Sequence, residues 1–127
     1  MPTPRLSKLD MQIMETLWTR GEASVREMME AFPAKKRPGY TTVQTMVYRL
    51  ITKKVVRRAR KVGNFYLFAA AISRDAAQRR LVDELLAIFG GESRPVVAHL
   101  IDAGKLSLDD VEFAEKTLKG LKEEKEA

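Results

Sequence analysis

The sequence predicts a mainly α-helical, α+β fold: a helical N-terminal part that ends in one small hairpin, then a second helical part. Three observations predict it. Apolar residues recur at helical spacing in three segments before residue 53. Two β-branched or aromatic segments then flank Gly63-Asn64, and helical spacing returns after Ser73. The 127 residues allow a compact domain and an oligomerisation segment. We place these domains at residues 1–72 and 73–127.

The first two helices begin at serines. Ser7 is a suitable N-cap for a helix that carries Asp10 in its first turn and stops near Gly21. Ser24 and Glu27 have the spacing of a capping box, in which each side chain accepts a hydrogen bond from the other residue's backbone. This pair predicts the start of a second helix, which ends at Pro33.

The third helix has one apolar and one polar side. After a polar loop over residues 34–39, Thr41 or Thr42 is expected to cap a helix that runs to about Lys53. Its apolar positions have the spacing of one buried face: Val43, Met46, Val47, Leu50 and Ile51. Opposite them lie Thr41, Thr45, Tyr48, Arg49 and Thr52, flanked by Thr42 and Gln44.

A basic hairpin follows the third helix. Residues 55–62 and 65–69 have strand composition, and Gly63-Asn64 between them fits a two-residue type I′ or II′ turn. Three helices followed by such a hairpin form the pattern of a winged helix-turn-helix, in which the third helix enters the major groove of DNA and the hairpin, or wing, contacts the flanking backbone.

Three short amphipathic helices are expected after residue 73. The first ends at Gly90-Gly91, the second has Pro95 in its first turn and Gly104 as its stop, and Ser107 caps the third. We expect the tail from residue 122 to be frayed. About 55 residues in this form bury little apolar surface alone. We therefore predict a homodimer joined through Leu81, Leu85, Phe89, Val97, Leu100, Ile101, Val111, Ala114, Leu118 and Leu121. The alternative is that the last helix folds back on the two before it within one monomer.

The charge distribution separates the two parts. Residues 1–70 carry 14 Lys+Arg and 5 Asp+Glu, whereas residues 71–127 carry 9 and 12. No acidic residue lies between Glu30 and Asp75. Such a stretch favours a polyanionic partner, and double-stranded DNA fits the fold. A basic surface that is merely solvated is the alternative.

The residues predicted to contact DNA come from the third helix and the wing. Gln44 can pair with adenine and Arg49 with guanine, while hydroxyl and cationic groups suit phosphates. Tyr48 could instead pack beside Lys53, and Arg49 could be solvated and inert. The predicted DNA-binding set is Thr41, Thr42, Gln44, Thr45, Tyr48, Arg49, Lys53, Arg58, Arg60 and Lys61.

Composition argues against several other classes of protein. The chain has no cysteine and one histidine, His99, so we predict no metal site and no cofactor. No catalytic constellation is present, which argues against an enzyme. No apolar run approaches the ~18 residues of a membrane span, and we expect a cytoplasmic protein without membrane insertion. A winged helix that binds proteins rather than DNA is the second functional hypothesis. It predicts that function survives loss of Arg49 and Arg58 but not changes in the C-terminal helices.

Three segments together resemble the penicillinase repressors of the BlaI/MecI family. They are LSKLDMQIMETLW, which resembles the first helix of that family, TTVQTMVYRLITKKVV, which resembles the recognition helix and the next strand, and GNFYLFAAAISRDA, which resembles the return strand and its exit. The resemblance covers nearly the whole chain and is most specific through residue 70. It implies a homodimeric transcriptional repressor on a palindromic operator.

The resemblance also concerns relief of repression. In the best-known members, signalling through a membrane sensor protease leads to cleavage of an Asn-Phe bond, which corresponds here to His99-Leu100. The chain departs from the family at both positions, which counts against this route. Copper-responsive relatives use a C-terminal cysteine pair, which this sequence lacks.

Overall fold

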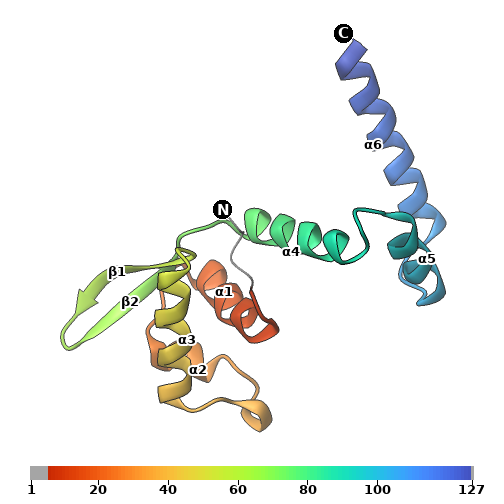
Figure 1. The fold of residues 1–127 in the computed structure, drawn as a ribbon. Coiled ribbons are helices and arrows are strands. Elements are labelled where there is room, and N and C mark those ends of the chain that lie inside the picture. Colours follow the sequence, from red (N-terminus) through yellow and green to blue (C-terminus); the bar gives the residue numbers. More distant parts are fainter. Residues whose placement is uncertain (1–5, 127) are drawn as a thin grey trace. The chain divides into compact units, whose positions relative to one another are not determined.

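The computed structural model describes residues 6–126 and confirms the predicted order of three helices, a hairpin and three helices (Figure 1). The chain forms two compact units, Met1–Val82 and Asp83–Ala127. This division falls inside a helix, ten residues after the boundary placed from the sequence. The elements are α1 (Lys8–Arg20), α2 (Val25–Glu30), the 3₁₀ helix η1 (Ala34–Lys36), α3 (Tyr40–Thr52), β1 (Val56–Val62), β2 (Phe65–Ala70), α4 (Arg74–Ile88), α5 (Arg94–Asp102) and α6 (Leu108–Glu126).

The capping boxes start α1 and α2 as the sequence indicates. Ser7 Oγ accepts from the Asp10 amide at 3.0 Å, and Asp10 Oδ2 accepts from the Ser7 amide at 2.9 Å. Ser24 and Glu27 make the same exchange at 3.2 and 2.9 Å. The hydrogen bond from the Ser24 backbone lowers the pKa of the Glu27 carboxyl. Each box satisfies two amides that the first turn of a helix otherwise leaves unpaired.

The segment between α2 and α3 is more ordered than the polar loop expected from the sequence. The second helix already ends at Glu30, and Ala34–Lys36 form η1. Arg37 stabilises this early end, because its Nη2 donates to the carbonyl oxygens of Glu30 and Phe32 at 2.9 and 3.0 Å. A cationic donor at the last carbonyls of a helix favours termination there.

The start of α3 differs from the sequence prediction, whereas its end at Thr52, with Lys53 as the C-cap, agrees with the predicted end at about Lys53. The helix begins at Tyr40 with Gly39 as a cap that offers no side chain, so neither Thr41 nor Thr42 caps it. At the other end the Val55 amide donates to the Leu50 carbonyl at 3.1 Å, and Lys54 has a φ of 66°. This is the Schellman arrangement, which usually places glycine at the left-handed position.

The hairpin contains a β-bulge that the alternation of apolar and polar residues in its sequence does not reveal. Cα pairing runs from Val62↔Phe65 to Arg60↔Leu67 and then shifts, so that Arg58 rather than Ala59 pairs with Phe68. Gly63 has a φ of 59°, and Asn64 is not left-handed, as in a type II′ turn. The base of the wing is extended by Ala23, which exchanges two backbone hydrogen bonds with Phe68 at 3.0 and 2.9 Å.

One hydrophobic core holds the first unit together. It joins α1, α2, α3 and the base of the wing through Ile13, Met14, Leu17, Met28, Val43, Val47, Leu50, Val55 and Phe68, none of which is more than 2% exposed. Full burial of each such side chain contributes roughly 1.5–3 kcal/mol. Ala77 of α4 is also fully buried in this core, which explains why the first unit extends past residue 72.

The second unit consists of helices without a buried interior of their own. Gly90 and Gly104 end α4 and α5 with φ values of 65° and 70°. The Asp110 amide donates to Ser107 Oγ at 3.2 Å at the start of α6. The predicted fraying after residue 121 is wrong, because α6 continues to Glu126. None of the helices described is long and apolar enough to cross a membrane.

The left-handed Lys54 gives a test of the backbone. A non-glycine residue in this left-handed region is strained by roughly 1–2 kcal/mol, and glycine removes this strain. Glycine also increases the conformational entropy of the unfolded chain, which offsets part of the gain in stability. Lys54→Gly should therefore raise the free energy of unfolding by about 0.5–1 kcal/mol in urea titrations. Ala31→Gly, at a helix end with a φ of −73°, is the control and should lower it. A loss of stability in both variants would contradict the assignment.

Candidate nucleic-acid interface

One side of α3 is polar and open to solvent. Val43, Val47 and Leu50 on its other side are fully buried. Most side chains that the sequence assigned to the interface are exposed, and Gln44 is half-buried; the exposed ones are Thr41, Thr42, Thr45, Tyr48 and Arg49. The helix thus uses its apolar side for the core and leaves its polar side available for the major groove of a duplex.

The hydroxyl groups of this side differ in what they can still do. Thr45 Oγ1 donates to the Thr41 carbonyl at 3.0 Å, which occupies its proton within the helix. Thr45 can then offer mainly its methyl group, which suits the methyl group of thymine. Thr41 and Thr42 lie in the first turn, where the cap at Gly39 supplies no side-chain acceptor. The amides of this turn and the two hydroxyls can donate to phosphate oxygens.

The bulge divides the cations of β1 between the two faces of the wing. Residues that pair across a hairpin lie on the same face, and Phe68 and Leu67 point to opposite faces. Arg58 therefore shares a face with Phe68, whereas Arg60 shares the other face with Leu67. Without the bulge, Arg58 and Arg60 would have pointed the same way.

Arg58 connects the wing to α3. Its guanidinium carbon lies 5.6 Å from the ring centroid of Tyr48 and 5.5 Å from that of Tyr66. Lys61 Nζ lies 5.7 Å from the Tyr66 ring on the same face. Cation–π contacts at these distances hold the charges against the rings. Tyr48 is 44% exposed and lies against the guanidinium group of Arg58.

Two of the predicted cations have acidic neighbours. Arg60 Nε lies 2.9 Å from Glu22 Oε2. Lys53 Nζ lies 3.9 Å from Oδ2 of Asp10, a buried carboxylate in α1. The structure therefore places Arg58 against the polar side of α3, with Lys61 on the same face of the wing, and places Arg60 and Lys53 in ion pairs with carboxylates.

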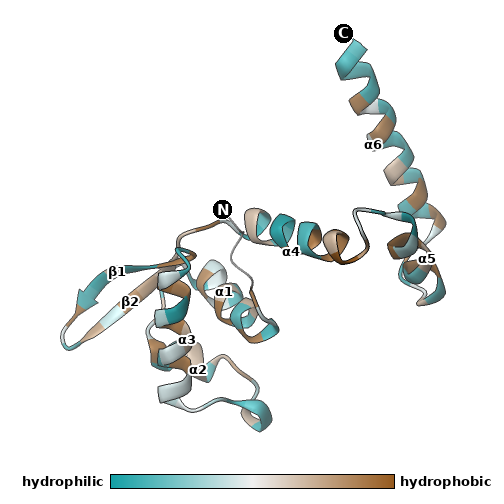
Figure 2. Ribbon diagram, in the orientation of Figure 1, coloured by the Kyte–Doolittle hydropathy of each residue, from teal (hydrophilic) through white to brown (hydrophobic). Residues whose placement is uncertain are grey.

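A groove of about 370 Å³ separates α3 from the wing. It is lined from α2, α3 and β2 by Ser24, Val25, Arg26, Tyr40, Gln44, Tyr48, Asn64, Phe65, Tyr66 and Phe68. None of these residues is acidic, and most residues of β1 are hydrophilic (Figure 2). The groove has the position expected for a DNA strand that passes between a recognition helix and a wing.

Tyr66 was not among the residues predicted to contact DNA. Counting outward from the Gly63-Asn64 turn pairs Lys61 with Tyr66, so the turn alone could have identified this neighbour. Lys35 and Lys36 in η1 are also exposed cations next to α3 in the chain. Their place in the acid-free stretch was the available signal.

The residues predicted to join two copies are half-buried or exposed in the single chain. Leu81 and Leu100 are half-buried; Leu85, Phe89, Val97, Ile101, Val111, Ala114, Leu118 and Leu121 are exposed. Apolar residues recur along α4, α5 and α6 (Figure 2). Ile88, Leu108 and Phe113 are large exposed apolar residues that the prediction omitted. His99 is exposed in α5, beside the half-buried Leu100.

Comparison with known proteins finds matches over most of the chain. The model of the penicillinase repressor family matches residues 6–120. Two proteins named transcriptional regulator BlaI, from Mycobacterium tuberculosis strains CDC 1551 / Oshkosh and ATCC 25618 / H37Rv, are each 28% identical over 117 residues, which is 90% of this chain and 83% of theirs. The solution structure of monomeric Bacillus licheniformis BlaI with the blaP half-operator aligns with a TM-score of 0.47 at 23% identity, over 58% of this chain and 89% of that one.

The separation of Arg58 from Arg60 predicts unequal effects on binding to duplex DNA. Arg58→Ala removes a cation from the face that adjoins α3 and should weaken binding by about 1 kcal/mol. Arg60→Ala removes the same charge from the other face and should weaken binding by less than half of this. Fluorescence anisotropy with a labelled duplex at fixed salt measures both. Equal losses would show that the two faces contribute alike.

Proposed function

The chain belongs to the penicillinase repressor family, and we propose that it acts as a homodimeric transcriptional repressor on a two-fold symmetric DNA operator in the bacterial cytoplasm. The observation that carries the proposal is the exposed polar side of α3 next to the cationic face of the wing. The names of the relatives, transcriptional regulator BlaI, agree with it.

In this proposal α3 lies in the major groove and reads base edges. Gln44 and Arg49 are the side chains with the geometry for bidentate contacts to adenine and guanine. The amides at the start of α3, with Arg58 and Lys61 of the wing, contact the phosphates on either side. The acid-free stretch from residue 31 to 74 adds attraction that does not depend on sequence and weakens with salt.

The proposed pairing of two chains is supported by the uncovered apolar side chains of the second unit. None of the residues from 83 to 126 is buried in the single chain. A helical segment with so much apolar surface in water is stabilised by a partner of the same kind, and cyclic two-fold dimers are the commonest such assembly. In a dimer, each copy of the small DNA-binding domain could recognise one of two half-sites that lie about one helical turn, or a multiple of it, apart.

The route of relief stays a prediction based on the family resemblance. A sensor protease would have to cut between His99 and Leu100, which lie inside α5. The Ala103 amide donates to the His99 carbonyl at 2.9 Å, so this helix would have to open before the bond could enter a protease.

Two substitutions separate base recognition from general attraction. Arg49→Ala should lower affinity for a selected operator by about 1–3 kcal/mol and relax the preference at one base pair. Lys61→Ala should weaken all duplexes alike and reduce the slope of log affinity against log salt by about 1. Mobility shifts with excess competitor DNA at ~0.15 M salt measure both. If Arg49→Ala leaves the preference for the operator unchanged, the polar side of α3 is not the surface that reads the bases.

The dimer is tested in α6. Leu118 is 67% exposed in the single chain, so Leu118→Glu should leave a monomer undisturbed but introduce a charge into a dimer interface. We expect the dissociation constant of the dimer to rise about tenfold or more. Sedimentation velocity would show this as a larger fraction of monomer. Lys116→Gln changes the net charge equally on the opposite side of α6 and should leave the dimer intact. Equal behaviour of the two variants would argue against the predicted seam.

A further inference from the structure

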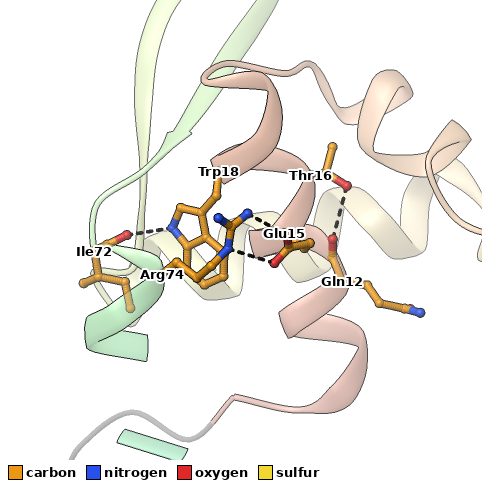
Figure 3. Close-up of polar contacts among 6 residues, drawn as sticks. All are labelled: Gln12, Glu15, Thr16, Trp18, Ile72 and Arg74. Atoms are coloured by element: carbon orange, nitrogen blue, oxygen red, sulfur yellow. Dashed lines mark hydrogen bonds and ion pairs between the residues drawn. The ribbon is translucent and has the colours of Figure 1, made fainter. Parts of the chain in front are cut away.

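The start of α4 is bonded to α1 by a tryptophan. The indole Nε1 of Trp18 donates to the carbonyl oxygen of Ile72 at 2.9 Å, across 54 positions of sequence (Figure 3). Ile72 lies two residues before α4, and both residues pack against the core of the first unit. The polypeptide that leaves the wing is thus held at a defined backbone atom before the helix begins.

An arginine adds a second attachment one step further along the chain. Arg74 is the first residue of α4, and its guanidinium carbon lies 5.5 Å from the Trp18 ring centroid. The same guanidinium lies beside Glu15, with Nη2 2.6 Å from Oε1 and Nε 3.2 Å from Oε2 (Figure 3). A two-pronged ion pair combined with a stacked ring restrains direction as well as distance.

A buried alanine provides a further contact between α4 and the core of the first unit. Ala77, one turn after Arg74, is fully buried in the core of the first unit. Residues 72 to 77 are therefore attached by a hydrogen bond, a stacked cation, an ion pair and packing. The same helix continues to Ile88, beyond the end of the first unit at Val82. None of these residues belongs to the polar side of α3 or to the wing.

We propose that Glu15, Trp18 and Arg74 form a positioning clamp that fixes the start of α4 on the DNA-binding unit and so couples dimer pairing to operator binding. The proposal rests on the proposed function. When one half of a dimer is bound, the second half meets its half-site at an effective concentration set by the stiffness and geometry of the connection. A fixed α4 keeps that concentration high, whereas a loosened one spreads the second unit over unproductive orientations.

The experiment compares two DNA probes. The first is a duplex with two half-sites, selected from a random-sequence library by the full wild-type chain. The second is the same duplex with one half-site scrambled. Glu15→Gln and Arg74→Ala should each weaken binding to the two-site duplex about five- to tenfold and change binding to the one-site duplex less than about twofold. Fluorescence anisotropy at fixed salt measures both affinities.

Glu15→Gln is the decisive variant because electrostatics predicts the opposite result. It removes a negative charge, so a purely electrostatic effect would strengthen binding to both duplexes. Asp75→Asn makes the same change of charge and breaks an ion pair with Arg79 inside α4, at 2.7 Å. It should not weaken binding to the two-site duplex. The chain has one tryptophan, so its fluorescence should change in Arg74→Ala and not in Asp75→Asn.

The outcomes separate the clamp from the proposed function. Unchanged binding of both duplexes by Glu15→Gln and Arg74→Ala, or equal losses on both, overturns the clamp while DNA binding stands. A two-site loss in Asp75→Asn as large as in Glu15→Gln also overturns it. If the wild-type chain enriches no duplex from the library, the proposed function fails, and the clamp fails with it. Only a loss confined to the two-site duplex supports the clamp.

Discussion

The packing of the apolar side of α3 is the constraint on which the interface depends. Val43, Val47 and Leu50 are buried against the core, so the helix cannot rotate about its axis without exposing them. Each such side chain brought into water would cost roughly 1.5–3 kcal/mol. This penalty is what keeps the polar side outward. The same core holds the base of the wing through Val55 and Phe68, which places the wing cations relative to α3.

The interface combines rings and cations in a particular order. Arg58 contacts a tyrosine of α3 and a tyrosine of β2, so it links the two elements. Its position depends on the extra residue in β1, because a regular strand would have paired Ala59 with Phe68. A charge of the same type two positions later, Arg60, has a carboxylate as its neighbour instead. Position along a basic strand is therefore a poor guide to which face of the wing a cation lies on.

The helices and the hairpin were predictable because their signals are local. Ser7-Asp10, Ser24-Glu27 and Gly63-Asn64 act within a few residues, and apolar spacing identified the buried side of α3. The start of α3 at Tyr40 was missed because threonines are common caps and Gly39 carries no side-chain signal. The bulge and the link from Trp18 to Ile72 could not be predicted, since both depend on residues brought together only by the complete fold. Within the candidate site, the members on α3 followed from periodicity, whereas the separation of Arg58 from Arg60 did not.

The two hydrogen bonds between Ala23 and Phe68 have a consequence for the dynamics of the wing. Both residues are buried, so their amides can meet solvent only when the core itself opens, on the timescale of global unfolding. Gly63 and Asn64 at the far end of the hairpin are exposed, and their amides need no such event. Amide protection therefore falls along the hairpin from its base to its tip. Local adjustment of the hairpin is confined to its outer residues, while the inner ones move with the domain as a whole.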